Sequence, residues 1–462
     1  MKREVVGTTR VCGLIGNPVH HTLSPAIHNT LNDITDTDMV YVPFEVKGED
    51  VEAAVKGALA LDILGMNVTV PHKSAVMPYL KEIDPVAERL GAVNTLVRTH
   101  DGTGFRGYNT DYSGISRSLR EAGVDVLGKS VVILGAGGVA RPAAFLSASE
   151  GAKEIFILNR TLERAEALCR DVNAYVGKDV AVPMELSKYN ELPDDRKYIC
   201  FQMTMVGMHP NPDSAVIEDT GFYKKVEIGF DAVYRPLNTK FLQLCKEAGA
   251  KCISGLKMLL YQGIDAYEMW NGIKVKESLC GRLYGKLLGE LMDGKSIVLT
   301  GFMGSGKSSV AVRLCEILGY EMLDSDAEIE QMQSATINTI FREQGEGAFR
   351  DMETEFVKEL SEDKRKRIVL SVGGGLPIKP ENRDYLKRIG TVVFLKARPE
   401  TVYERVKGDK SRPLLKSDDV LAKIKELQEE RRDVYKAACD IEIDTDDKSI
   451  DQVANEIIEL ML

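Results

Sequence analysis

The sequence offers little cysteine, tryptophan or histidine chemistry. Its 462 residues include eight cysteines without a Cys-x-x-Cys pair, one tryptophan, and six histidines that all lie before residue 210. This spacing gives no sign of a disulfide framework or a cysteine-based zinc site. His20, His21 and His28 could ligate a metal, but no carboxylate or cysteine joins them at ligand spacing. We therefore interpret these histidines as turn and cap residues.

Long apolar runs and a basic excess are also lacking. No stretch approaches the ~20 apolar residues that span a bilayer, and the N-terminal MKREVVGTTR has no apolar core typical of a secretory signal. Sixty basic residues stand against 70 acidic ones, a net charge of −10, which is not the balance of a nucleic-acid binder. The KRKR run at 364–367 is interpreted as a solvated helix end or turn. We expect a cytoplasmic protein whose partners are small molecules, with neither nucleic acid nor membrane, and its oligomeric state stays open.

The remaining pattern predicts an α/β protein of several domains. Hydrophobic residues make up 44% of the chain, which suffices for a large core, and this length suggests two to four domains. Short β-branched runs alternate with helical patterns, which indicates parallel sheets. The predicted strands begin near Val11, Ile63, Ser130, Glu154, Glu227, Ser296, Ile368 and Thr391.

A long helical pattern separates two series of strands. It covers roughly 257–292 with a break at Trp270–Gly272, and a short Asp293–Gly294 break follows it. We expect a junction around residues 290–295. The predicted domains are an α/β substrate lobe (1–115), a Rossmann domain (116–292) whose last helices return to that lobe, and a third α/β domain with a parallel sheet (293–462).

The stretch VVILGAGGVAR predicts a dinucleotide-binding turn. Gly135, Gly137 and Ala140 fit G-x-G-x-x-G/A between a strand and a helix, and the next strand ends at Asn159. Such glycines let the backbone turn tightly and approach a pyrophosphate at a helix N-terminus. A bare strand-to-helix loop would look similar.

The end of the following strand bears on which dinucleotide binds. It reads Asn-Arg-Thr, where an acidic residue would bind the ribose 2′-hydroxyl of NAD and an arginine pairs with the 2′-phosphate of NADP. Arg160 therefore favours NADP(H), although it could be a surface arginine that starts the next helix. The expected cofactor-binding residues here are Gly135, Ala136, Gly137, Gly138, Val139, Asn159, Arg160 and Thr161.

Six motifs follow one another over residues 1–285. They read GNPVHHTLSPAIHN, NVTVPHK, GAVNTL, GYNTDY, DAVYRPLNT and MLLYQG. In this order they resemble the shikimate dehydrogenases. The resemblance implies an NADP-dependent reduction of 3-dehydroshikimate, with Thr22 and Ser24 gripping the substrate carboxylate. It also implies a set of substrate-binding residues: Thr22, Ser24, Asn67, Thr69, Asn94, Tyr234 and Gln262.

These residue types suit a polyhydroxylated acid, because each buried polar group left unpaired costs ~1–3 kcal/mol. Reduction of a ketone by hydride also needs a proton donor beside the carbonyl oxygen, worth roughly 10²–10⁴ in rate. Lys73 is our candidate for that catalytic role, with Asp111 holding it. Taken singly, Lys73 could be a surface ammonium and Asp111 a helix N-cap.

Two positions depart from the family pattern. Thr22 stands where the family usually has serine, and the added methyl group leaves quinate open as a substrate. The family's Asn-Ala/Thr-Thr run is replaced by QMTMVGM at 202–208, a segment expected to line the nicotinamide pocket. Thr204 and Met208 remain there as expected cofactor-binding residues, and the altered run leaves the affinity for NADP open.

GFMGSGKSS satisfies G-x-x-x-x-G-K-[ST] between a predicted strand and helix. Its backbone N–H groups surround phosphates, Lys307 reaches the β/γ oxygens and Ser308 ligates Mg²⁺. The segment thus predicts a P-loop that binds ATP. The expected ATP-binding residues are Gly301, Gly304, Ser305, Gly306, Lys307, Ser308 and Ser309.

Three further features bear on the phosphoryl acceptor. Asp324 and Asp326 would share one side of an extended stretch, one serving Mg²⁺ and the other the acceptor hydroxyl. Arg350 and Glu353 are three apart on one helix face, so the arginine can bind a carboxylate that Glu353 helps to orient. The run at 373–375 would give a flat ring a backbone platform. Alternatively, Asp324 simply ends a strand and the Arg350–Glu353 pair lies on the surface.

With RPLL and ERRDVY, these features resemble the shikimate kinases, which have a nucleoside-monophosphate-kinase-like fold. The resemblance assigns shikimate to Arg350, Gly373, Gly374, Gly375 and Arg431. It assigns the attacking hydroxyl to Asp326, Mg²⁺ to Asp324 with Ser308, and a catalytic lid over ATP to Arg412. Asp433 replaces the family's usual proline, so Arg431 and Arg432 compete as the carboxylate ligand.

Together the two halves predict a bifunctional enzyme of aromatic amino-acid biosynthesis. A quinate/shikimate dehydrogenase fused to the kinase is one alternative. A chain in which one half is a non-catalytic, ligand-sensing module is another.

Overall fold

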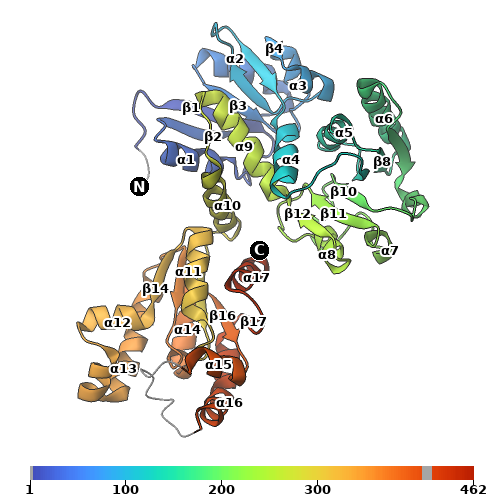
Figure 1. The fold of residues 1–462 in the computed structure, drawn as a ribbon. Helices are drawn as coiled ribbons and strands as arrows, with labels where there is room; N and C mark the ends of the chain where they lie inside the picture. Colours follow the sequence, from blue (N-terminus) through green and yellow to red (C-terminus); the bar gives the residue numbers. More distant parts are fainter. Residues whose placement is uncertain (1–3, 408–418) are drawn as a thin grey trace. The chain divides into compact units, whose positions relative to one another are not determined.

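The computed structural model describes residues 4–407 and 419–462 and divides into two compact units, Met1–Leu287 and Leu288–Leu462. Each unit is built from sheets covered by helices (Figure 1). The expectation of an α/β protein with parallel sheets is confirmed.

The first sheet of the front unit has the strand order β2-β1-β3-β5-β6-β4. Its first three strands are parallel, whereas β5 pairs antiparallel with both β3 and β6. The strands are β1 (Arg10–Gly16), β2 (Met39–Glu45), β3 (Gly65–Val68), β4 (Glu82–Ile83), β5 (Thr95–Arg98) and β6 (Phe105–Tyr108). The helices are α1 (Ser24–Thr35), α2 (Val51–Ala60), α3 (Pro85–Leu90) and α4 (Thr110–Glu121).

His28 corrects one interpretation from the sequence. It lies inside α1, fully buried, and its ring stacks on Tyr41 at 4.2 Å between centroids. Burial lowers the pKa of His28 to about 3, so the ring is neutral. This histidine is therefore a core residue and not a turn or cap residue.

The second sheet is parallel throughout, in the order β12-β11-β10-β7-β8-β9. The order reverses between β7 and β10, as in doubly wound folds that bind a dinucleotide at this point. The strands are β7 (Ser130–Leu134), β8 (Glu154–Asn159), β9 (Ala181–Glu185), β10 (Tyr198–Gln202), β11 (Val226–Asp231) and β12 (Lys251–Ile253). The helices are α5 (Ala140–Ser149), α6 (Leu162–Val176), α7 (Thr220–Tyr223), α8 (Lys240–Glu247), α9 (Gly255–Asn271) and α10 (Glu277–Leu291).

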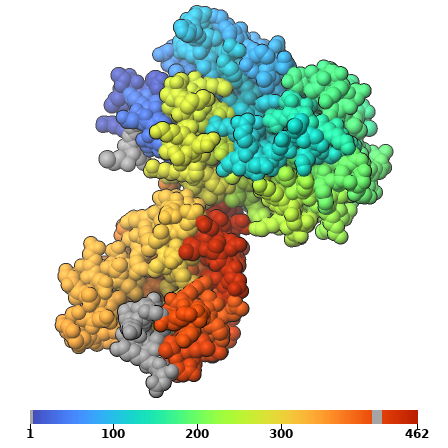
Figure 2. Space-filling model, in the orientation of Figure 1, coloured from blue at the N-terminus to red at the C-terminus, as the bar shows by residue number. Residues whose placement is uncertain are grey.

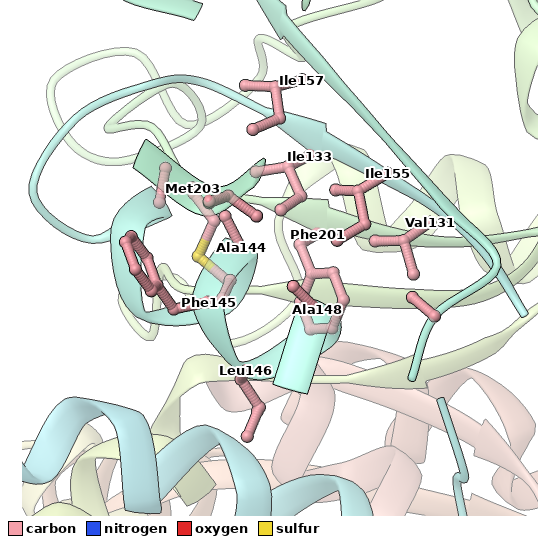
Figure 3. Close-up of a cluster of buried hydrophobic side chains, with 14 of the residues drawn as sticks. Val131, Ile133, Ala144, Phe145, Leu146, Ala148, Ile155, Ile157, Phe201 and Met203 are labelled. Carbon is pink, nitrogen blue, oxygen red and sulfur yellow. The ribbon is translucent and has the colours of Figure 1, made fainter. Parts of the chain in front are cut away.

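One of the two hydrophobic cores of this second sheet lies between the strands and α5. Figure 3 shows Ile133, Ile155 and Phe201 from three neighbouring strands, close to side chains of α5 such as Ala144 and Ala148. Small residues on α5 let the helix approach the sheet, and the larger β-branched residues fill the space beneath it.

Helices α4 and α9 pack side by side, and in the space-filling view the yellow surface of α9 adjoins the teal segment that includes α4 (Figure 2). Their close approach requires a glycine, since a methyl group at Gly114 would lie 2.8 Å from the carbonyl oxygen of Met258. Near the other end of α9, the indole Nε1 of Trp270 donates to the Leu96 carbonyl at 2.9 Å, over Gly65. The predicted break in the helical pattern is confirmed, because α9 ends at Asn271 and Gly272 follows with φ +64°.

The rear unit contains one parallel sheet in the order β14-β15-β13-β16-β17. Its strands are β13 (Ser296–Thr300), β14 (Glu321–Asp324), β15 (Ile368–Ser371), β16 (Gly390–Lys396) and β17 (Ile441–Asp444). The helices are α11 (Lys307–Leu318), α12 (Ser325–Gln333), α13 (Ile337–Glu362), α14 (Pro380–Ile389), α15 (Pro399–Val406), α16 (Val420–Ala438) and α17 (Ile450–Met461). Helix α17 packs against α11, the helix that follows the glycine-rich loop.

Within the described ranges, none of the helices is long and apolar enough to cross a membrane.

Replacing Ile133 by alanine tests the core of the second sheet. Ile133 is fully buried, so Ile133→Ala should lower the free energy of unfolding of the front unit by about 3 kcal/mol. Urea unfolding followed by circular dichroism measures the loss. Val182→Ala on β9, where the side chain is 41% exposed, is the matched control and should cost less than about 1 kcal/mol. Equal losses in the two variants would contradict this account of the core.

Candidate active sites

Lys73 and Asp111 form an ion pair at the edge of the first sheet. Lys73 lies shortly after β3, and its Nζ is 2.6 Å from Asp111 Oδ2. Asn94 Nδ2 donates to the other carboxylate oxygen at 2.9 Å. The two paired side chains are only 21% and 10% exposed, so Lys73 is not a free surface ammonium.

Asp111 is not the N-cap of α4. The cap is Asn109, whose side chain accepts hydrogen bonds from the backbone N–H groups of Asp111 and Tyr112. Because Asn109 satisfies the helix terminus, the Asp111 carboxylate is available to Lys73 and Asn94.

The expected substrate amides and hydroxyls extend this network. Asn67 Nδ2 donates to Thr95 Oγ1 at 3.1 Å, and Thr95 Oγ1 donates to Asn94 Oδ1 at 3.0 Å. Tyr41 donates its hydroxyl to Asn67 Oδ1 at 2.7 Å. Sequence reasoning missed Tyr41, which lies outside the quoted motifs, and Thr95, which lies in GAVNTL but was passed over beside Asn94.

Thr22 and Ser24 form a second group at the start of α1. Thr22 Oγ1 donates to Ser24 Oγ at 3.1 Å and accepts from the Ser24 backbone N at 3.2 Å. Thr69 follows β3, and its methyl group lies so close to Gly16 that any side chain there would collide with it.

The last two predicted substrate residues come from distant segments. Gln262 is buried on α9, where a methyl group at Gly114 would lie 3.2 Å from its Cβ, so the α4–α9 contact carries Gln262 close to the helix of Asp111. Tyr234 follows β11 in the second sheet, and burial raises the pKa of its hydroxyl. Packing therefore places Gln262 beside α4, the helix that carries Asp111.

The predicted cofactor residues follow three adjacent strands. Gly135, Arg160 and Thr204 come after β7, β8 and β10, and these strands are parallel neighbours, so the three residues share one edge of the sheet. Gly135 has φ +109°, and a methyl group on it would lie 2.9 Å from Thr204 Cγ2. Space above Gly137 and Gly138 is open, and α5 begins at Ala140 without a side-chain cap. A helix N-terminus beside open glycines suits a pyrophosphate.

The other predicted members flank these positions. Asn159 Nδ2 donates to the Thr161 carbonyl at 2.8 Å, which closes the turn between β8 and α6. Arg160 is exposed on that turn and lies before the first residue of α6. Ala136 and Val139 lie within the glycine loop, and Met208 is 42% exposed beyond Thr204.

In the rear unit, the P-loop wraps the start of α11. Gly301, Gly304 and Gly306 all have positive φ, and a methyl group at Gly301 would lie 2.5 Å from the Leu395 carbonyl oxygen. Lys307 Nζ donates to the carbonyls of Gly301 and Phe302 at 2.9 and 3.1 Å. The loop borders a cavity of about 530 Å³, lined among others by Gly304, Ser305, Gly306, Lys307, Ser308, Ser309, Asp324, Asp326, Gly373, Gly374, Arg405 and Thr445.

The two aspartates reach this cavity differently from the expectation. The extended stretch predicted for Asp324 and Asp326 is wrong, because β14 ends at Asp324 and Asp326 lies in the first turn of α12. Asp324 Oδ1 accepts from the backbone N of Asp326 at 3.1 Å and so caps the helix. Burial and the Asp324 charge raise the pKa of Asp326.

Arg350 and Glu353 are not a surface ion pair. Their side chains meet at 2.7 Å, and the Glu353 side chain is only 1% exposed. Burial raises the pKa of Glu353 to about 7. Glu346, which is largely exposed, accepts a second hydrogen bond from Arg350 at 2.9 Å.

The glycine run is required by the side chains that pack on it. A methyl group at Gly373 would lie 2.6 Å from Asp326 Oδ1 and 3.1 Å from Glu353 Oε1. One at Gly375 would lie 2.4 Å from the Arg350 guanidinium. The backbone platform predicted at 373–375 is therefore partly covered by Asp326, Glu353 and Arg350, the residues predicted to act beside it.

Tyr435 joins α16 to the same run. Its hydroxyl donates to the Gly374 carbonyl at 2.7 Å. Burial raises the pKa of Tyr435, while the nearby Arg431 and Arg350 oppose that rise. Arg432, in contrast, is exposed and pairs with Glu429 at 3.1 Å. Of the two arginines, Arg431 lies beside Tyr435 and is the better placed to bind a carboxylate at the glycine run.

Arg412 lies outside the described residues, so its expected role over ATP stays a prediction. Sequence reasoning missed Arg405 on α15, which donates to the Ser305 carbonyl at 3.3 Å and to Thr445 Oγ1 at 3.2 Å. It thereby joins the P-loop to the residue after β17, 140 residues further along the chain.

Three family models match the chain. "Shikimate dehydrogenase substrate binding domain" matches residues 14–96, "Shikimate / quinate 5-dehydrogenase" matches residues 118–191, and "Shikimate kinase" matches residues 303–462.

Curated relatives and solved structures match the front part. The NADP(+) shikimate dehydrogenase of Methanothermobacter thermautotrophicus is 43% identical over 269 residues, which are 58% of this chain and 93% of the relative. A crystal structure of shikimate dehydrogenase with NADP+ is 37% identical, with a TM-score of 0.56 over 62% of this chain and 97% of that one. The Listeria monocytogenes enzyme, solved with shikimate and NAD, is 33% identical, with a TM-score of 0.57 over 61% and 99%.

This chain belongs to the shikimate dehydrogenase family. Its rear part is a shikimate kinase domain. The chain is thus a bifunctional enzyme of the shikimate pathway, and its two parts imply NADP and ATP as cofactors.

Glu353→Gln tests how the buried Glu353 carboxyl makes the free energy of unfolding depend on pH. Because the folded pKa of about 7 exceeds the ordinary 4.5, the protonated form stabilises the fold below pH 4.5, and this contribution is lost as pH rises through 7. The loss should amount to about 3 kcal/mol in the free energy of unfolding and be absent in the glutamine variant.

Urea unfolding of the rear unit at pH 5 and pH 8 measures the difference. Glu346→Gln is the matched control, since it removes the exposed partner of the same arginine and should leave the pH dependence unchanged. A Glu353→Gln variant with the pH dependence of the original chain would refute the assignment.

Proposed function

We propose that the front unit reduces 3-dehydroshikimate to shikimate with NADPH. The rear unit then transfers the γ-phosphoryl group of ATP to the hydroxyl created by that reduction, giving shikimate 3-phosphate. The single observation that carries the proposal is the Lys73–Asp111 pair at 2.6 Å, a half-buried proton donor within a set of neutral amides and hydroxyls.

Lys73 supplies the proton of the reduction. NADPH, when bound, supplies the hydride to the carbonyl carbon. As the carbonyl oxygen becomes an alkoxide, Lys73 Nζ donates a proton to it. Asp111 keeps the ammonium in place, and Asn94 fixes the second oxygen of that carboxylate at 2.9 Å.

Neutral polar groups bind the rest of the substrate. Thr22 and Ser24 take the carboxylate, and Asn67, Thr69, Asn94, Tyr234 and Gln262 take the hydroxyl groups. The hydrogen bonds among Asn67, Thr95 and Asn94 support this assignment, because they hold the amides in place before the substrate arrives.

The glycine loop fits a dinucleotide phosphate. The open space over Gly137 and Gly138 admits a pyrophosphate to the backbone, at the uncapped start of α5. Arg160 on the neighbouring turn would pair with the 2′-phosphate of NADP.

In the kinase, catalysis comes mainly from positioning the substrates and neutralising charge on the transferring phosphoryl group. Lys307 holds the β/γ oxygens of ATP. Ser308 and Asp324 offer the oxygen ligands that Mg²⁺ prefers, and they line the same cavity as Asp326. Asp326 accepts the proton of the attacking hydroxyl, and its raised pKa suits that task.

The substrate carboxylate lies with the two arginines. Arg350 and Arg431 bind it over the glycine run, and Arg412 acts on the transferring phosphoryl group. The contact of Tyr435 with the Gly374 carbonyl supports Arg431, since it draws that turn of α16 to the run.

A coupled assay with dehydroshikimate, NADPH and MgATP tests the whole proposal. The unsubstituted chain should produce shikimate 3-phosphate. Lys73→Ala should lose at least 10²-fold in NADPH oxidation yet still phosphorylate added shikimate. Lys307→Ala should oxidise NADPH and accumulate shikimate. If either unit is a ligand-sensing module without catalysis, the corresponding activity will be missing from the unsubstituted chain.

Quinate oxidation is the second candidate for the front unit, because the methyl group of Thr22 alters the carboxylate site and leaves the choice between shikimate and quinate open. We expect kcat/KM for shikimate to exceed that for quinate, because both hydroxyls of the Thr22–Ser24 pair remain. Thr22→Ser removes only the methyl group and should change the ratio by less than about tenfold. A higher kcat/KM for quinate in the unsubstituted chain would replace the proposed substrate.

A further inference from the structure

Gln202 is buried at the end of β10 and fixes the turn that follows it. Its Oε1 accepts from the backbone N of Thr204 at 2.6 Å and from Thr204 Oγ1 at 2.7 Å. Its Nε2 donates to the Val206 carbonyl at 3.0 Å and to Asp231 Oδ1 at 3.2 Å. One side-chain amide thus satisfies both ends of the turn and connects it to the neighbouring strand β11.

Asp231 is the second centre of the same network, and it is fully buried. Oδ1 also accepts from the backbone N of Val233 at 2.9 Å, and Oδ2 accepts from Thr239 Oγ1 at 2.5 Å. Thr239 in turn is the N-cap of α8. All the partners of the carboxylate are donors, so the carboxylate organises the backbone of two loops.

Both loops carry residues that the proposed function uses. The turn held by Gln202 contains Thr204 and leads to Met208. Gly135 of the cofactor loop packs against this turn, since a methyl group added to Gly135 would lie 2.9 Å from Thr204 Cγ2. The loop held by Asp231 runs from Val233 to Tyr234. The Gln202 and Asp231 side chains are themselves fully buried.

We propose that Gln202 and Asp231 are positioning residues of the dehydrogenase. Gln202 holds the 204–208 segment against the nicotinamide, and Asp231 holds both this segment and the Tyr234 loop. The family usually has an asparagine at position 202, and the extra methylene of glutamine lets one amide reach Thr204 and Asp231 together. The inference rests on the proposed placement of the nicotinamide beside Thr204 and Met208.

Gln202→Met tests the first half. Methionine keeps the length and volume of the side chain but leaves the Thr204 N–H and the Val206 carbonyl without their partner. KM for NADPH should rise about tenfold, KM for dehydroshikimate should change less than about twofold, and the kinase rate of the same chain should stay unchanged. Gln243→Met is the matched control, because Gln243 on α8 also donates to a backbone carbonyl, that of Asn238 at 2.9 Å. This control should leave both KM values unchanged.

Asp231→Asn tests the second half and should raise both KM values, since it disturbs both loops. Gln202→Asn is the milder variant if methionine prevents folding. Its shorter amide cannot reach Thr204 and Asp231 at once, so KM for NADPH should rise about threefold.

The inference fails if KM for NADPH in the Gln202 variants stays within twofold of the Gln243 control, or if the two KM values rise equally in those Gln202 variants. A drop in melting temperature without a change in KM also overturns it, as the network would then be purely structural. The absence of NADPH oxidation in the unsubstituted chain would instead defeat the proposed function, so the two failures are distinguishable.

Discussion

Parallel strands end at a common edge, and this constraint decides where the polar groups of both units lie. In the second sheet, the loops after β7, β8 and β10 bring Gly135, Arg160 and Thr204 to one edge, although up to 69 residues separate them. In the rear sheet, the loops after β13, β14 and β15 bring the P-loop, Asp324 and Gly373 to one cavity in the same way. Once the strand order is set, the composition of a few short loops determines the chemistry.

Several glycines occur where a neighbouring side chain or helix leaves no space for a Cβ atom. A methyl group at Gly373 or Gly375 would collide with Asp326 or the Arg350 guanidinium, respectively. One at Gly114 would collide with α9, the helix that carries Gln262. These glycines therefore serve packing against polar groups rather than an open surface. The same crowding buries Glu353 and raises its pKa.

The parts predictable from sequence were those in which chemistry fixes local geometry. The P-loop and the glycine turn before α5 follow from backbone requirements, and strands such as β7 and β13 follow from β-branched runs, so their positions were predicted well. The Lys73–Asp111 contact joins residues 38 positions apart in sequence, and its prediction came only from family resemblance.

The misses have a common physical origin in competition for helix ends and in long-range contacts. Asp324 caps α12, so Asp326 lies in the first turn of that helix and not in the expected extended stretch. At α4 the cap is Asn109, which leaves the Asp111 carboxylate to Lys73. Arg405 and Gln202 act through partners in other loops, for which sequence spacing gives no signal.

The burial of Trp270 has a practical consequence. It is the chain's single tryptophan, it lies in the front unit, and its indole N–H is bonded to the Leu96 carbonyl beneath the first sheet. Intrinsic fluorescence excited at the red edge of the protein band will therefore report on the front unit alone. The rear unit has no tryptophan in its sequence and will be optically silent, so the melting of one unit can be followed inside the intact fusion without cutting the chain.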